Sequence, residues 1–195
     1  MGMHVSTLLN VPSKGFETYI YVADPDGQFT DWLNENFQNV SLQVGKHNLI
    51  IRGSSDSYDK ELWDFMVEHC KDDLFGLLES LFHESASLIV SEGALHQQSG
   101  KVHVIPVLSL AGDKEFTGKE LAGEILKVVV SAVNNGNLES KLSELGAVEF
   151  NIQGSKQKII ISTLKFINNH FELKPSFAGI GINLNQMIEN LIKRY

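Results

Sequence analysis

The chain has 195 residues, of which 43% are hydrophobic, and this length and composition suit one globular domain with an adequate core rather than a disordered chain. The formal net charge is −8, from 24 acidic and 16 basic residues, which disfavours free DNA or RNA as a partner of the acidic part. No apolar run reaches the roughly 20 residues that a membrane-spanning helix needs.

Residues 1–12 lack the basic start and the long apolar core of an export signal. Cys70 is the single cysteine, so an internal disulfide is excluded, and a packed free thiol is a simpler interpretation than a nucleophile. We therefore expect a cytoplasmic protein without a membrane anchor. It is predicted to fold as a single α/β domain over residues 1–195, with residues 1–15 considered as a flexible N-terminal segment.

The amino-terminal third is predicted as strand, short helix, strand. Thr18 to Ala23 is rich in aromatic and branched residues and runs into Asp24-Pro25-Asp26-Gly27, a turn signature. Thr30 can cap a short helix after this turn. Residues 40–44 then alternate like a half-buried strand, and Gly45 turns the chain into the next element.

The central part of the chain, residues 47–92, is predicted as one strand, helix, strand unit. Residues 47–53 form an apolar run ended by Gly53, which is typical of a strand buried on both faces. A helix is predicted from about Ser57, in one piece or in two, because Asp72, Asp73 and Gly76 interrupt its apolar spacing. If the strand over residues 87–91 pairs directly with the first one, the two must be parallel, with a right-handed crossover. The predicted core positions are Leu49, Ile50, Ile51, Leu88, Ile89 and Val90.

Further along, residues 101–110 are predicted as a strand in which Pro106 marks an edge, a bulge or a break, because proline cannot donate to the ladder. Thr117 can cap a helix with apolar residues at core spacing, and residues 138–145 form a second small helix. Residues 148–152 and 158–163 suggest a β-hairpin, although residues 159–171 could equally be helical. The predicted fold class is thus α/β, with a mixed or mostly parallel sheet flanked by helices, a C-terminal β-hairpin and a closing helix.

The negative charge is concentrated in residues 54–92, where 10 acidic residues stand against Lys60 and Lys71. Asp64, Glu68 and Asp72 are four residues apart, so they share one helical face. This face is interpreted either as a solvated surface or as a docking surface for a basic protein. A second copy of the chain could supply that surface through residues 154–174, where four lysines outnumber one glutamate.

The motifs that most often carry chemistry are absent from the sequence. There is no phosphate-binding Gly-x-x-x-x-Gly-Lys loop, no His-Glu-x-x-His, no Cys-x-x-Cys and no Gly-x-Ser-x-Gly. The seven histidines are scattered, and none is spaced from another as zinc ligands are. No cofactor and no metal site are indicated.

The best candidate site is the segment from Arg52 to Asp56, because ligands of open parallel sheets bind beyond the carboxyl ends of the strands. Arg52 could clamp an anion, Gly53 would allow close approach, and Ser54 and Ser55 could donate hydroxyls. This pattern describes a small phosphorylated or carboxylated ligand. The alternative is structural: serines that cap the following helix, and an Arg52 to Asp56 ion pair.

Two classes of function follow from these patterns. The first is a non-catalytic binding or regulatory module that engages a protein or a small anionic ligand near the Arg52 to Asp56 loop. The alternative is a metal-assisted hydrolase, with Asp24, Asp26 and Asp56 at neighbouring strand ends and His96 as a base. Asp24 and Asp26 also have a structural interpretation, as turn residues that bond their own backbone.

Overall fold

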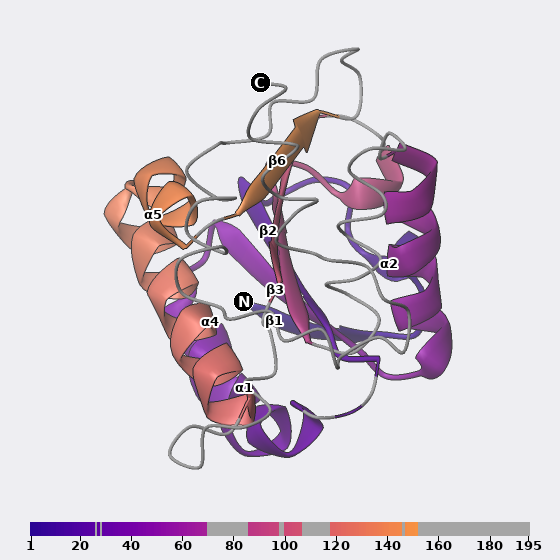
Figure 1. Ribbon diagram of the computed structural model, residues 1–195, viewed down its shortest axis with the longest axis horizontal. Helices are drawn as coiled ribbons and strands as arrows, with labels where there is room; N and C mark the ends of the chain where they lie inside the picture. The colour runs from indigo at the N-terminus through magenta and orange to yellow at the C-terminus, as the bar shows by residue number, and fades with distance from the viewer. Residues whose placement is uncertain are drawn as a thin grey trace, which may run out of the picture.

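The computed structural model describes residues 1–25, 27, 29–69, 86–97, 100–106, 118–145 and 147–151. These residues form a six-stranded mixed sheet with helices on both faces, in the strand order β1-β3-β2-β4-β5-β6 (Figure 1). The strands are β1 (Gly2–Val5), β2 (Thr18–Ala23), β3 (Asn48–Gly53), β4 (Ser87–Ser91), β5 (Lys101–Pro106) and β6 (Val148–Asn151). The helices are α1 (Thr30–Gln43), α2 (Asp56–His69), α4 (Gly118–Asn135) and α5 (Leu138–Glu144), with 3-10 turns η1 (Leu8–Asn10) and η2 (Leu95–Gln97).

The expected α/β class, a mixed sheet flanked by helices, is confirmed. Of the predicted β-hairpin, only β6 lies in the described part of the chain, where it pairs antiparallel to β5. The second hairpin strand, the closing helix and the basic segment over residues 154–174 lie outside the described residues.

The sheet is organised around β2, which is parallel to β3 and antiparallel to β4. The strands β3 and β4 do not pair directly, because β2 lies between them, so the condition under which they would have to be parallel is not met. The physical reason is that β3 has its two edges covered by β1 and β2, so β4 can only use the free edge of β2. The apolar runs at Ile50 and Ile89 signal burial on both faces but carry no information about strand direction.

Side chains of the central strands alternate between two apolar layers. Tyr21, Ile51 and Ile89 pack toward α2, whereas Ile50 and Val90 pack toward α1, α4 and α5 on the other face. Among the described helices, Figure 1 shows α2 on one side of the sheet and α1, α4 and α5 on the opposite side. All six predicted core residues, Leu49, Ile50, Ile51, Leu88, Ile89 and Val90, are at most 1% exposed, which confirms the core prediction.

The strand predicted over residues 40–44 is wrong, because α1 continues to Gln43. Val40 and Val44 are four residues apart, and both are buried on the helix face that also carries Leu33 and Phe37. Over so few residues, the spacing of Val40 and Val44 fits the period of a helix as well as that of a strand. Gly45 ends the helix with a φ of 82°, a left-handed conformation that glycine adopts without strain.

The first residues of the chain belong to the sheet. β1 pairs in parallel with β3, and Val5, Leu8 and Val11 are buried on the α2 side. The segment that was considered flexible over residues 1–15 thus supplies a strand and part of a core. The strand predicted over residues 101–110 is present as β5 up to Pro106, and the remainder of that range lies outside the described residues.

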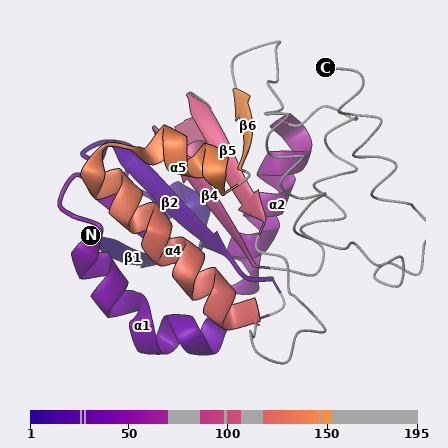
Figure 2. The same cartoon turned by 60° about the vertical axis from the view of Figure 1, so that its left-hand side comes forward.

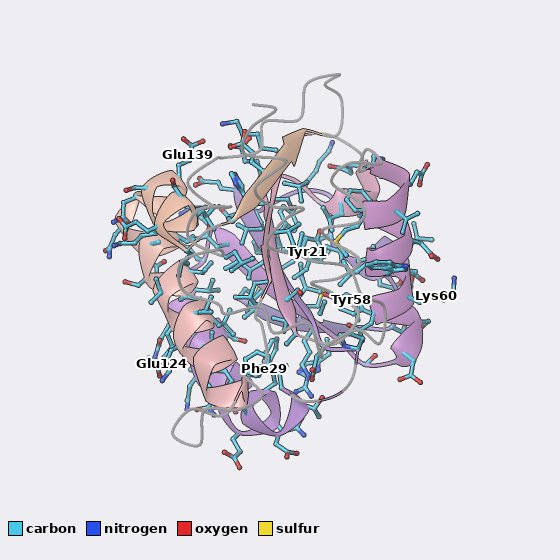
Figure 3. The ribbon with its side chains drawn as sticks, in the orientation of Figure 1. Tyr21, Phe29, Tyr58, Lys60, Glu124 and Glu139 are labelled. Carbon is cyan, nitrogen blue, oxygen red and sulfur yellow. The ribbon has the colours of Figure 1, made fainter. Side chains whose placement is uncertain are left out.

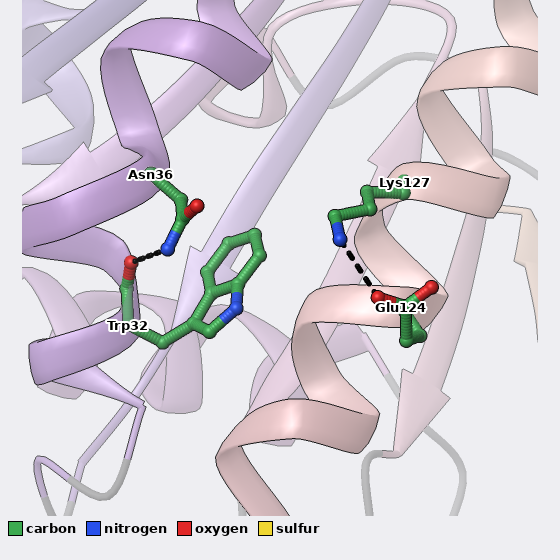
Figure 4. A network of polar contacts seen from close by, with 4 residues as sticks. All are labelled: Trp32, Asn36, Glu124 and Lys127. Carbon is green, nitrogen blue, oxygen red and sulfur yellow. Dashed lines mark hydrogen bonds and ion pairs between the residues drawn. The ribbon is translucent and has the colours of Figure 1, made fainter.

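Helices α1 and α4 pack against each other through a tryptophan and a glycine, and Figure 2 shows them side by side. A Cβ on Gly123 would lie 2.3 Å from Cε2 of Trp32, so only glycine admits the indole there. The Nζ atom of Lys127 forms an ion pair with Glu124 at 2.7 Å (Figure 4). The same atom lies 5.8 Å from the centre of the Trp32 ring. Asn36 donates to the Trp32 carbonyl one turn earlier, at 2.9 Å. The helix predicted after Thr117 is confirmed.

Candidate functional site

The candidate site lies where two neighbouring parallel strands send their helices to opposite faces of the sheet. After β2 the chain enters α1 on one face, and after β3 it enters α2 on the other. Such a switch point opens a crevice at the carboxyl ends of the strands, where ligands of open sheets bind. This crevice is at the carboxyl ends of the parallel strands, the general place where the sequence predicts a site.

A pocket of about 290 Å³ opens at this place, between the end of β2 and the first turns of α2. Its lining residues are Ala23, Pro25, Asp56, Asp59, Lys60, Leu62, Trp63 and Met66. The wall is apolar apart from two carboxylates and one ammonium group from the beginning of α2. Figure 3 shows Tyr58, a neighbour of these residues, directed toward the sheet, and Lys60 on the outer side of the helix.

Asp59 is the most unusual charged group of the pocket. Burial raises the pKa of its carboxyl, and the negative charges of Asp24 and Asp56 raise it further. Its Oδ1 accepts a hydrogen bond of 2.9 Å from the backbone N–H of Asp24, which opposes these effects. Within the described part of the chain, its Oδ2 receives no hydrogen bond. Asp59 thus lines the pocket with one carboxylate oxygen unbonded in that part of the chain.

Asp24 serves the turn and the start of α1. Its carboxylate accepts from the N–H of Phe29 at 3.0 Å and from the hydroxyl of Thr30 at 2.8 Å, while its carbonyl accepts from Gly27 at 3.1 Å. These are the bonds of the structural alternative, in which the turn residue bonds its own backbone. Asp26, the other turn carboxylate proposed as catalytic, lies outside the described residues.

The predicted anion site from Arg52 to Ser55 is divided between the two faces of the sheet. Arg52 follows Ile50 in the alternation and lies on the α1 side, away from Asp56. No ion pair joins Arg52 to Asp56 or to any other described residue. A Cβ on Gly53 would lie 2.5 Å from Cδ1 of Tyr58, so the close approach that this glycine permits is to a core side chain.

The serines after Arg52 are bonded to the amino-terminal segment. The N–H of Ser54 donates to the carbonyl of Val5 at 2.8 Å. The hydroxyls of Ser55 and Ser57 donate to the carbonyl of Ser6 at 3.0 and 2.9 Å. Of the two hydroxyls expected to face a ligand, that of Ser55 thus helps to fix the segment after β1 onto the start of α2.

His96, proposed as a base, lies near one end of β2, and the carboxylates lie at the other end. It follows β4, whose last residue Ser91 pairs with Tyr19 at the start of β2. Asp24 follows the other end of β2, which is roughly 15 Å away at 3.3 Å per residue. The ring of His96 instead lies within hydrogen-bonding distance of Ser13, with Nε2 and Oγ 3.0 Å apart.

Asp59, Lys60 and Trp63 line the pocket but were not singled out from the sequence as site residues, whereas Asp56 was. Asp56, Asp59, Lys60 and Trp63 have the spacing i, i+3, i+4, i+7, which places them on one face of α2. Asp59 was counted only as one acid among many. A stripe of acidic and aromatic side chains along one helix face, beginning directly after a strand end, is the signal that could have identified this pocket.

The three carboxylates of Asp24, Asp56 and Asp59 interact electrostatically, but no cluster of three metal-ligating side chains occurs in the described ranges. None of the helices in those ranges combines the length and the apolar character that a bilayer span requires. No family model, curated protein or solved structure matches the chain.

Proposed function

We propose that the chain is a non-catalytic binding module that engages a protein partner, and that the pocket beside α2 receives one side chain of that partner. The observation that carries this proposal is the pocket itself, at the switch point of the sheet. Its volume of about 290 Å³ is at the lower end of ligand pockets, which span roughly 300–1,000 Å³. That size suits a single long side chain better than a nucleotide or a cofactor.

The surface around the pocket supports a basic partner. Asp64 and Glu68 are exposed on α2 beyond the pocket, and Lys60 is paired with Asp64 at 2.7 Å, so little positive charge offsets the acids of this helix. Complementary charge accelerates association and selects partners. A second copy of the chain stays a candidate partner, and nucleic acid is not part of the proposal. The single cysteine supports a cytoplasmic location.

The two other functions considered from the sequence have less support. A metal-assisted hydrolase would need a base near its carboxylates, whereas His96 lies near the opposite end of β2. A small anionic ligand at the Arg52 to Asp56 loop would need free donors, whereas Ser55 and Ser57 donate to Ser6. Asp56 and Asp59 would also repel an anion in the pocket.

The proposal is tested with short host peptides that differ only in one central residue. The protein has two tryptophans, so a Trp32→Phe variant makes Trp63 the reporter of the pocket. We expect at least one central side chain to change Trp63 fluorescence and to shift backbone amide signals from Ala23 and the first turns of α2. Ala23→Leu, which adds volume to the pocket wall, should abolish this binding, and Leu42→Ala on exposed α1 surface should not.

If no central side chain binds at millimolar peptide, or if binding persists unchanged in Ala23→Leu, the pocket is not a docking site. Turnover of an ester or phosphoester that disappears in Asp59→Asn would instead support the hydrolase. Dispersed amide spectra of each variant serve as the control for folding.

A further inference from the structure

We propose that the side chain received by this pocket is a lysine, with its alkyl stem against Leu62, Trp63 and Met66 and its ammonium group between Asp59 and Asp56. This inference rests on the proposed function and specifies its partner. The protein would then recognise an exposed lysine in a segment of another protein. Three features of the pocket support the assignment.

The first feature is uncompensated negative charge. Asp56 and Asp59 both line the pocket, and the one cation of the lining, Lys60, is held by Asp64 at 2.7 Å. The half-buried carboxylate of Asp59 has lost part of its hydration and is close to two other carboxylates, which is the reason for its raised pKa. A positive group from outside would relieve both effects.

The second feature distinguishes an ammonium from a guanidinium. Arginine binds carboxylates best through two parallel hydrogen bonds to both oxygens of one group. Oδ1 of Asp59 already accepts from the backbone of Asp24, so a two-bond arginine pair would have to share Oδ1 with that backbone bond. The two acids are three residues apart on α2 and offer separate oxygens, which suits the compact, freely rotating ammonium of lysine.

The third feature is the depth of the apolar wall. Leu62 and Met66 are almost fully buried, and Ala23 forms the sheet side of the pocket. Lysine has a four-carbon stem that is stabilised by apolar contact while its head stays near polar groups.

The test uses glycine-based host peptides with central lysine, norleucine, arginine or acetyl-lysine, on the Trp32→Phe protein. Norleucine keeps the alkyl stem and removes the charge, and acetyl-lysine removes the charge at full length. We expect the lysine peptide to bind at least about tenfold more tightly than the norleucine and acetyl-lysine peptides, and more tightly than the arginine peptide. Free n-butylamine at the same concentrations shows whether the amine alone is sufficient.

Asp59→Asn is the decisive variant, because it keeps an acceptor for the Asp24 N–H while it removes the charge. It should weaken the lysine peptide by about tenfold or more and leave norleucine binding unchanged. Glu35→Gln is the matched control, since it removes the same charge from an exposed position of α1, outside the pocket and on the other face of the sheet, and it should change lysine binding by less than about threefold. Asp56→Asn provides a second test of the charge at the pocket.

The possible outcomes separate this inference from the proposed function. If norleucine binds as well as lysine, or if Asp59→Asn and Glu35→Gln weaken lysine binding equally, the lysine assignment is overturned while the docking pocket stands. If arginine binds more tightly than lysine, the assignment is also overturned. If no peptide of the series or of the wider set binds in the pocket, the proposed function itself fails.

Discussion

Asp59 holds a negative charge in a position that disfavours it. The carboxyl is half-buried, it lies near Asp24 and Asp56, and only one of its oxygens is bonded in the described part of the chain. A half-buried carboxylate near other carboxylates stabilises the fold less than a neutral side chain would. Charged groups in such positions are concentrated at functional sites. The residue therefore permits a test of function through stability.

We predict that Asp59→Asn raises the free energy of unfolding at neutral pH. The pKa of Asp59 is raised in the folded state, so the folded protein binds the proton more tightly than the unfolded chain, and charging the group above its ordinary value of 3.8 destabilises the fold. The gain from the variant should therefore disappear as the pH falls toward that value. Urea unfolding as a function of pH measures it, with Glu68→Gln as the control. A loss of stability at every pH would show that the charge supports the fold.

Gly53 gives a second prediction at the scale of one residue. A Cβ at this position would lie 2.5 Å from the ring of Tyr58, which is fully buried and cannot move away. We expect Gly53→Ala to lower the free energy of unfolding by about 1–3 kcal/mol, the usual effect of overpacking a core. Ser54→Ala, the next residue and an exposed one, should change it by less than about 0.5 kcal/mol in thermal or urea unfolding. Equal effects would mean that the loop adjusts to the methyl group.

At the scale of elements, strands with uninterrupted apolar runs were predictable and their partners were not. The runs at β3 and β4 identify both as internal strands, because burial on two faces removes the polar alternation. Their pairing depends on which edges are free, and this is decided by β1 and β2 far away in the sequence. The helix α1 was predicted too short because Val40 and Val44 fit both periods over so few residues.

The central position of β3 leads to a third prediction. Ile50 is fully buried and packs on the α1 side of the sheet, so Ile50→Ala should lower the free energy of unfolding by about 2–5 kcal/mol. Leu42→Ala on α1 is the control, because Leu42 is 77% exposed and the same kind of truncation there should have an effect below about 0.5 kcal/mol. Chemical denaturation of both variants decides the question. A loss below about 1 kcal/mol for Ile50→Ala would contradict the structure of the core.

For the whole molecule, the sheet consists of a parallel half, β1-β3-β2, and an antiparallel half, β4-β5-β6, that meet along one edge of β2. The position of the candidate site was predictable, since parallel strands carry sites at their carboxyl ends. Its chemistry was not, because sequence spacing could not show that Ser55 and Ser57 donate to Ser6 or that Asp59 bonds the backbone of Asp24. Contacts between segments so far apart depend on the finished fold.

The place of β2 at this junction has a consequence for synthesis on the ribosome. One edge of β2 pairs with β3 soon after translation, but the other stays open until residues 87–91 have emerged. The exposed segment, residues 18–23, is uncharged, aromatic and β-branched, which is the composition that cross-pairs between nascent chains. A polysome carrying many such intermediates holds them close together, so we expect cross-pairing between nascent chains to be favoured in the interval before β4 arrives.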